Sequence, residues 1–250
     1  TVVRVERESV RALENRLRKP YLGGAPLLND KDIPKKSAVV MSGTVGYVQH
    51  IDMPSLSGLA EKHELKIYVT ALPGTFLDHH TSLASVSGAC DAETLSEVSK
   101  AFIIDDNRSF RQDPRFGVQV LHEISSRALS PAVNDPGTAI QVIGVMIRVL
   151  SVWAKREELA DAQDEILYPR IYVQPLKAED LLDDFFNPVA RDGAAFLEVC
   201  VMLKKAYKAL TDIGDKELSK AAAKHADILL KRAEASLALD DDFKYLKSLP

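Results

Sequence analysis

The spacing of apolar residues changes at about residue 91, and this change constrains the fold more than any other feature of the chain. Between Ser37 and Gly88, short alternating and β-branched runs are separated by glycine and proline, as in small β-sheets. After Asp91, a good helix N-cap, apolar residues recur at helical spacing over most of the remaining chain. The sequence therefore predicts an α+β protein, with a small bent β-sheet or barrel-like module followed by a mainly helical bundle.

Short strands are expected at four places in the first module. They are the runs SAVVMSG, TVGYVQHID, LKIYVTA and SLASVSG, and a short helix, PSLSGLAEKH, lies between the second and the third. The run TLSEVSKAFII, after Asp91, is expected to be helical throughout. A later run, RIYVQP from Arg170 to Pro175, interrupts the helical pattern and is expected to pair with another strand.

The beginning of the chain is expected to form a separate segment. Residues 1–19 place Val3, Val10, Leu13 and Leu17 near one face, which predicts an amphipathic helix ended by Pro20. Residues 21–36 have the Gly, Pro, Asp and Lys content of a linker. The expected domains are therefore a helix and linker at 1–36, a β-rich module at 37–90 and a mainly helical domain at 91–250.

Charge and histidine spacing exclude several classes of function. The chain has 32 Lys and Arg, 36 Asp and Glu and a formal net charge of −4, and no window gathers basic residues into a phosphate-binding stripe. Nucleic acid is therefore not an expected partner. Cys90 and Cys200 lie far apart, and the six histidines form no HExxH or i, i+4 pair, so neither a metal nor a cofactor is expected.

Membrane spanning and assembly are judged from the apolar runs. The most apolar run, Thr138–Ala154, carries Gln141 and Arg148 and is shorter than the roughly 18 uncharged residues expected of a spanning helix. We therefore do not expect this chain to cross a membrane. Because it begins at Thr1 rather than Met, it is expected to be a piece of a longer protein. A homo-oligomer is expected, since the apolar helices offer more hydrophobic surface than one small core uses.

Arginines, acids and a helix start are concentrated between residues 108 and 139. The loop SPAVND ends in Asp135 before Pro136, which matches the N-cap and first residue of a long apolar helix. A helix N-terminus attracts anions, so this segment can receive an anionic group. A structural role stays open beside binding: Asp113 would hold Arg108, Glu123 would pair with Arg127, Ser130 would serve a turn and Asp135 would cap its helix. The candidate ligand-binding residues are Arg108, Gln112, Asp113, Glu123, Arg127, Ser130, Asn134, Asp135 and Thr138.

Two runs in this segment carry a family resemblance. RSFRQDPRFG, from Arg108 to Gly117, and RALSPAVNDPGTA, from Arg127 to Ala139, closely resemble the signature of a family of predicted bacterial membrane proteins, the domain of unknown function twenty-two fifty-four. SGTVGYVQHID, from Ser42 to Asp52, resembles the same family's serine-glycine-tyrosine strand. The strand region around ALPGTFLDHHTSLASV also resembles the hammerhead modules of biotinyl and membrane-fusion proteins, but it lacks their modified lysine.

The resemblance implies a location more than a reaction. It implies the soluble extramembrane domain of a bacterial inner-membrane protein, with its own transmembrane segments as a partner. Cys90 and Cys200 are expected to be reduced, which favours a domain that faces the cytoplasm. The leading hypothesis is a non-enzymatic sensing, gating or assembly domain that works through the polar motif at 108–138. The motif would bind a small anionic ligand, or it would couple the β-rich module to the helices.

An enzyme is the alternative hypothesis. It would be associated with the membrane and would act on an anionic or lipid-linked substrate, with Glu123 or Asp113 as base and the arginines clamping the anion. This alternative predicts a carboxylate that lines an open pocket. A purely structural motif predicts instead that the polar groups are buried and satisfy one another.

Overall fold

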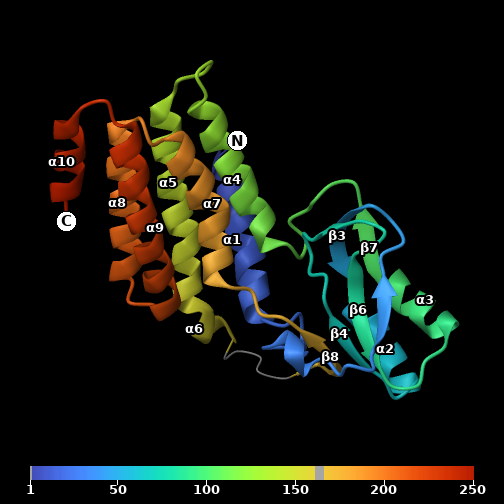
Figure 1. Ribbon diagram of the computed structural model, residues 1–250. Coiled ribbons are helices and arrows are strands. Elements are labelled where there is room, and N and C mark those ends of the chain that lie inside the picture. Colours follow the sequence, from blue (N-terminus) through green and yellow to red (C-terminus); the bar gives the residue numbers. More distant parts are fainter. Residues whose placement is uncertain (1, 161–165) are drawn as a thin grey trace. The chain divides into compact units, whose positions relative to one another are not determined.

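The computed structural model describes residues 2–160 and 166–250, and its backbone contacts divide the chain into two units (Figure 1). The β-rich unit comprises Glu14–Phe116 and Glu157–Leu176. The helical unit comprises Thr1–Leu13, Gly117–Arg156 and Lys177–Pro250. The predicted α+β class with a helical bundle is confirmed.

Two sheets form the framework of the β-rich unit in the part of the chain that the structure describes. In the larger sheet β1, β8 and β4 run parallel, whereas β6 and β2 are antiparallel to their neighbours. The strands of the smaller sheet are all antiparallel. The larger sheet has the order β1 (Gly24–Pro26), β8 (Tyr168–Val173), β4 (Lys66–Val69), β6 (Ser82–Ser87) and β2 (Ala38–Met41). The smaller sheet has the order β5 (Phe76–Leu77), β3 (Gly46–Ile51) and β7 (Phe102–Asp105).

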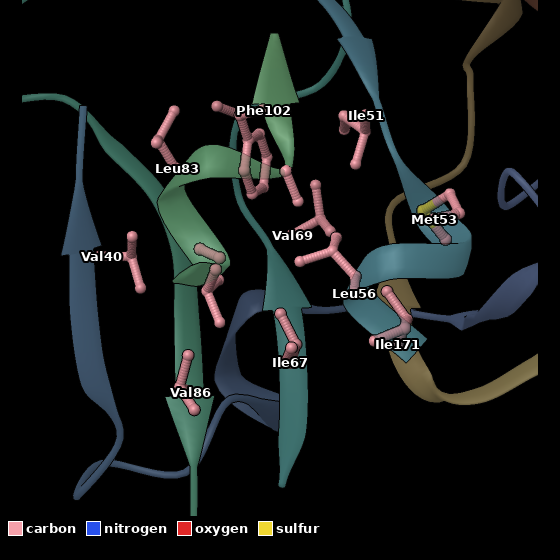
Figure 2. Close-up of a cluster of buried hydrophobic side chains, with 14 of the residues drawn as sticks. Val40, Ile51, Met53, Leu56, Ile67, Val69, Leu83, Val86, Phe102 and Ile171 are labelled. Carbon is pink, nitrogen blue, oxygen red and sulfur yellow. The ribbon is translucent and has the colours of Figure 1, made fainter. Parts of the chain in front are cut away.

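The core of the β-rich unit is built from strand residues that alternate toward one face. Figure 2 shows Val40, Ile67, Val86 and Ile171 directed into this core, and Leu56 reaches it from helix α2 (Met53–Lys62). Helix α2 packs against β8 and β4, and α3 (Ala92–Lys100) packs against β2, β7 and α2. Burial of these apolar side chains is the main force that holds the unit together. A short 3₁₀ turn, η1 (Asp30–Asp32), follows β1.

The helical unit is a bundle whose inner helices pack in a chain of neighbours. Helix α5 packs against α8, α8 against α9, and α9 against α7, while α10 rests on α8 and α9. Helices α1 and α4 each begin in one unit and end in the other. The helices are α1 (Val2–Arg18), α4 (Pro114–Ala128), α5 (Pro136–Ser151), η2 (Val152–Lys155), α6 (Arg156–Ala160), α7 (Ala178–Asp192), α8 (Leu197–Asp212), α9 (Lys216–Ser236) and α10 (Asp240–Ser248).

Most expected elements are confirmed, with one correction. The four expected strands are β2, β3, β4 and β6, the expected short helix is α2, and RIYVQP contributes to β8, which pairs with β1 and β4. The expectation that TLSEVSKAFII is helical throughout is wrong at its end. Helix α3 ends at Lys100, and the next residues form β7, because Phe102 and Ile104 pair with Ile51 and Val48 of β3.

The expected domain limits at residues 36 and 90 stay a prediction. The two units that the backbone contacts define have different limits. Residues 91–116 group with the β-rich unit, since β7 completes the smaller sheet. Residues 168–173 join it as β8, which lies inside the larger sheet. The extent of each unit therefore depends on pairing between strands that are far apart in the sequence. The composition of a short segment does not indicate such pairing.

Candidate functional site

A buried ion pair between Arg108 and Asp113 is the centre of the motif in the β-rich unit. Arg108 Nε donates to Asp113 Oδ2 at 2.7 Å, and a terminal guanidinium nitrogen donates to Oδ1 at 3.0 Å, so the pair is bidentate. The Asp113 side chain is 1% exposed and that of Arg108 is 15% exposed. The guanidinium also lies over the Phe116 ring, 5.8 Å from its centroid. This pair is the contact that the structural alternative predicted.

Asp113 also fixes the beginning of α4. Its Oδ1 accepts the backbone amides of Arg115 at 3.1 Å and Phe116 at 3.2 Å, as an N-cap carboxylate does, and Pro114 opens the helix. Burial raises the pKa of Asp113 above its ordinary value, although Arg108 and the two amides favour the ionised form. The loss of either partner would leave a buried charge without its compensation.

Gly74 makes room for this pair. A Cβ at position 74 would lie 2.4 Å from Asp113 Oδ2 and 2.8 Å from a terminal nitrogen of Arg108. The φ of Gly74 is +91°, in the left-handed region that favours glycine. Its amide donates to the carbonyl of Val48 at 2.7 Å, which ties the turn to β3. The dipeptide Pro73-Gly74 is typical of a turn, but no local pattern in the sequence indicates that Gly74 faces Asp113.

Gln112 joins the motif to the smaller sheet. Its Oε1 accepts the backbone amide of Ile51 at 2.9 Å, and its Nε2 donates to the carbonyl of the same residue at 3.3 Å. The side-chain amide therefore pairs with Ile51 as a neighbouring strand would. Gln112, in the loop before α4, therefore attaches this loop to strand β3 of the smaller sheet.

Arg16 is a buried cation that the sequence analysis did not single out. It is 5% exposed, and a terminal nitrogen donates to the carbonyl of Gln174 at 3.0 Å. Burial lowers the pKa of Arg16 to about 10, while the charge of Asp113 acts in the opposite direction. The spacing of Leu13, Arg16 and Leu17 was an available signal, since it places the arginine on the apolar face of α1.

The other candidate residues lie in the helical unit, and several of them have hydrogen-bond partners there. Glu123 does not pair with Arg127 as expected; it accepts a hydrogen bond from Gln119 Nε2 at 2.8 Å. Ser130 Oγ donates to the carbonyl of Arg127 at 2.7 Å, which is the expected turn contact. Asn134 is exposed, and its φ of 51° is in the left-handed region, which asparagine tolerates better than most residues.

Asp135 caps α5 as predicted. Its Oδ1 accepts the Thr138 amide at 3.0 Å, and its Oδ2 accepts the Thr138 hydroxyl at 2.6 Å. These hydrogen bonds lower the pKa of Asp135. The carboxylate thus occupies the helix end where an anionic ligand was expected to bind.

Replacement of Asp135 tests this cap. We expect Asp135→Ala to lower the melting temperature of the helical unit modestly, whereas Asp135→Asn retains most of it, because asparagine caps helices about as well as aspartate. Thermal unfolding followed by circular dichroism measures both variants. Equal losses in the two variants would contradict a capping role.

The candidates therefore fall into two groups, one in each unit. Asp113 is 1% exposed, so it does not supply the accessible carboxylate that the enzyme hypothesis requires. Residues 2–160 and 166–250 contain no group of three or more His, Cys, Asp or Glu side chains able to hold a metal ion. The first group is Arg108, Gln112 and Asp113; the second is Glu123, Arg127, Ser130, Asn134, Asp135 and Thr138.

One helical run in the described part of the chain is long and apolar enough to cross a membrane by length and composition. It extends over Pro136–Ala160 and has a mean hydropathy of 1.6 in its most apolar window. Much of it is α5, whose Val142, Ile143 and Met146 are fully buried within the protein. A core helix of a soluble protein passes the same test.

Comparison with known proteins places the chain in a family. A family model described as "Predicted membrane protein (DUF2254)" matches residues 1–209. Uncharacterized proteins of Mycobacterium bovis and Mycobacterium tuberculosis are 31% identical over 133 residues, which is 49% of this chain and 25% of theirs. The chain thus spans about a quarter of the length of the curated relatives it matches. No solved structure matches it. The chain belongs to the DUF2254 family of predicted membrane proteins.

Proposed function

We propose that this chain is an extramembrane domain of a bacterial inner-membrane protein, facing the cytoplasm, that takes part in gating or assembly through the motif at 108–138. Its partner would be the protein's own transmembrane segments. The family description supports the membrane location. We favour mechanical coupling over ligand binding, since Arg108 bonds to Asp113 and Thr138 bonds to Asp135 within the motif.

The observation that carries the proposal is the way Asp113 fixes α4. Four hydrogen bonds, two from Arg108 and two from backbone amides, attach the first turn of α4 to the β-rich unit. From Gly117 onward the same helix belongs to the helical unit. An α-helix is stiff over this length because its backbone hydrogen bonds are continuous. A displacement of the pair would therefore be passed along α4.

Hydrogen exchange on the 250-residue chain tests this coupling. The variant Arg108→Lys keeps the charge but loses the fork-shaped pair with Asp113. We expect faster amide exchange at the start of α4 and also in its later turns, from Gly117 to Ala128. Arg127→Lys is the matched control, because it makes the same kind of substitution within α4 itself, away from the ion pair. Faster exchange confined to residues before Gly117 would contradict coupling.

A thermal-shift titration with inorganic phosphate and sulfate tests the ligand version. A rise in melting temperature that is lost in both Arg108→Ala and Asn134→Ala would favour anion binding at the motif over coupling. Coupling predicts instead that neither anion shifts the melting temperature specifically, while Arg108→Ala lowers it without any ligand. The size of a specific shift would give the affinity, since stabilisation grows with the ratio of ligand concentration to dissociation constant.

A further inference from the structure

His225 is buried in the helical unit among aromatic rings. The side chain, on α9, is 1% exposed. Its ring centroid lies 5.8 Å from that of Phe186 on α7 and 6.0 Å from that of Tyr207 on α8, and the Tyr207 ring is stacked. The Tyr207 hydroxyl is buried and has no hydrogen-bond partner among the residues that the structure describes. The surroundings of the imidazole are therefore largely apolar.

The carboxylate of Asp183 contacts both the His225 ring and Lys224. Asp183 Oδ1, on α7, lies 2.8 Å from His225 Nε2, so a neutral ring donates its Nε2 proton to the carboxylate. Lys224 Nζ lies 3.3 Å from Asp183 Oδ2 and 2.8 Å from Glu179 Oε1. A protonated His225 ring would be a second cation beside Asp183, and it would have to share this carboxylate with Lys224. The same contacts join α9 to α7.

We infer that the contact between α7 and α9 at His225 is a proton-responsive junction, in which protonation of the ring loosens α9 from α7. Protonation would add a charge and a second N–H donor to a side chain that water scarcely reaches. The charged groups that act most strongly on the ring are Asp183 and Glu179 on α7 and Lys224 on α9. Helix α8 contributes Tyr207, and α10, which carries Asp240, Asp241 and Asp242 in its first turn, also packs on α9.

The pH range of the response follows from the direction of the pKa shift. Burial lowers the pKa of His225, although Asp183 and Glu179 act in the opposite direction. The folded protein thus binds the proton less readily than the unfolded chain, whose histidine has a pKa of about 6.5. Stability is complete above this value and falls as the pH drops from about 6.5 through the folded-state pKa. The junction lies outside the motif at 108–138, so this inference does not depend on the proposed function.

Proton NMR and hydrogen exchange together test the junction. The His225 ring resonance, assigned by its absence in His225→Gln, is followed from about pH 7.5 to about pH 5. Amide exchange in α7 and α9 is measured over the same range, with intrinsic rates corrected. We expect the ring to titrate below its ordinary pKa and protection of both helices to fall along the same curve. Both His225→Gln, which keeps a donor for Asp183, and His225→Phe should lose the response.

His122→Gln is the matched control, because His122 is a partly buried histidine of the same unit whose pKa burial also lowers. This variant should keep the response of α7 and α9. A response that survives both His225 variants would overturn the inference. A His225 ring that titrates at or above its ordinary pKa would also overturn it.

Discussion

Asp113→Ala is expected to destabilise the β-rich unit by about 3–5 kcal/mol, as the loss of one partner of a buried ion pair does. The substitution removes the acceptor of the two Arg108 bonds and leaves the half-buried guanidinium without the Asp113 carboxylate. It also removes the N-cap of α4. Urea unfolding measures the loss, with a probe that reports strand structure separately from helix structure, since the two units need not unfold together.

Two other variants identify the cause of the loss. Asp106→Ala changes an exposed aspartate in the same loop and should leave the unfolding midpoint nearly unchanged. Asp113→Asn keeps an oxygen that can cap α4 but loses the charge that pairs with Arg108, so most of the destabilisation should remain. Retention of wild-type stability in Asp113→Asn would show that the cap matters and the ion pair does not.

Gly74→Ala is expected to have an effect of similar size through steric overlap. The left-handed backbone conformation costs an alanine about 1–3 kcal/mol, and forcing a methyl group into occupied space adds about 1–3 kcal/mol. The overlap is severe because the atoms at 2.4 and 2.8 Å belong to side chains that are held in a bidentate pair. Urea unfolding of the variant should therefore show a much lower midpoint with an unchanged slope.

The double variant Gly74→Ala with Asp113→Ala gives a sharper result. In the absence of the Asp113 carboxylate, the added methyl group at position 74 overlaps with fewer atoms. Gly74→Ala should therefore lower the free energy of unfolding less in the Asp113→Ala background than in the wild-type protein. Such coupling is expected between residues in direct contact. Gly43→Ala is a suitable control, because its φ of +66° is also left-handed but no atom lies within 4 Å of the added Cβ. Simple additivity in the double variant would contradict the proposed packing of Gly74 on the pair.

The parts of the fold that the sequence predicted depend on neighbours within a few residues. Asp91 and Asp135 cap helices through the residues three positions later, so both caps could be recognised in the sequence. The four expected strands could be recognised for a similar reason, because their apolar and polar residues alternate over a few positions. The extent of α3 could not be predicted, because Phe102 becomes a strand residue only through its pairing with Ile51, far away in sequence.

The candidate site follows the same division between local and distant contacts. The pairing of Arg108 with Asp113 spans one turn and was anticipated as a structural possibility. Gly74 lies against Asp113, which is 39 positions later in the sequence, and Gln112 bonds to Ile51, which is 61 positions earlier. No local sequence pattern at these residues indicates either neighbour. Glu123 shows that local rules also fail, since its carboxylate accepts a hydrogen bond from Gln119 and forms no ion pair with Arg127 in the described part of the chain.

The position of β8 has a consequence for the order in which the protein folds. This strand enters the larger sheet between β1 and β4 and runs parallel to both, yet it is the last strand of that sheet in sequence. A nascent chain that has not reached Val173 thus lacks an interior strand, and β1 and β4 have no partner on that side. Long-range parallel pairing of this kind is slow. During synthesis the larger sheet therefore cannot be completed until a segment encoded after α4 and α5 has been made.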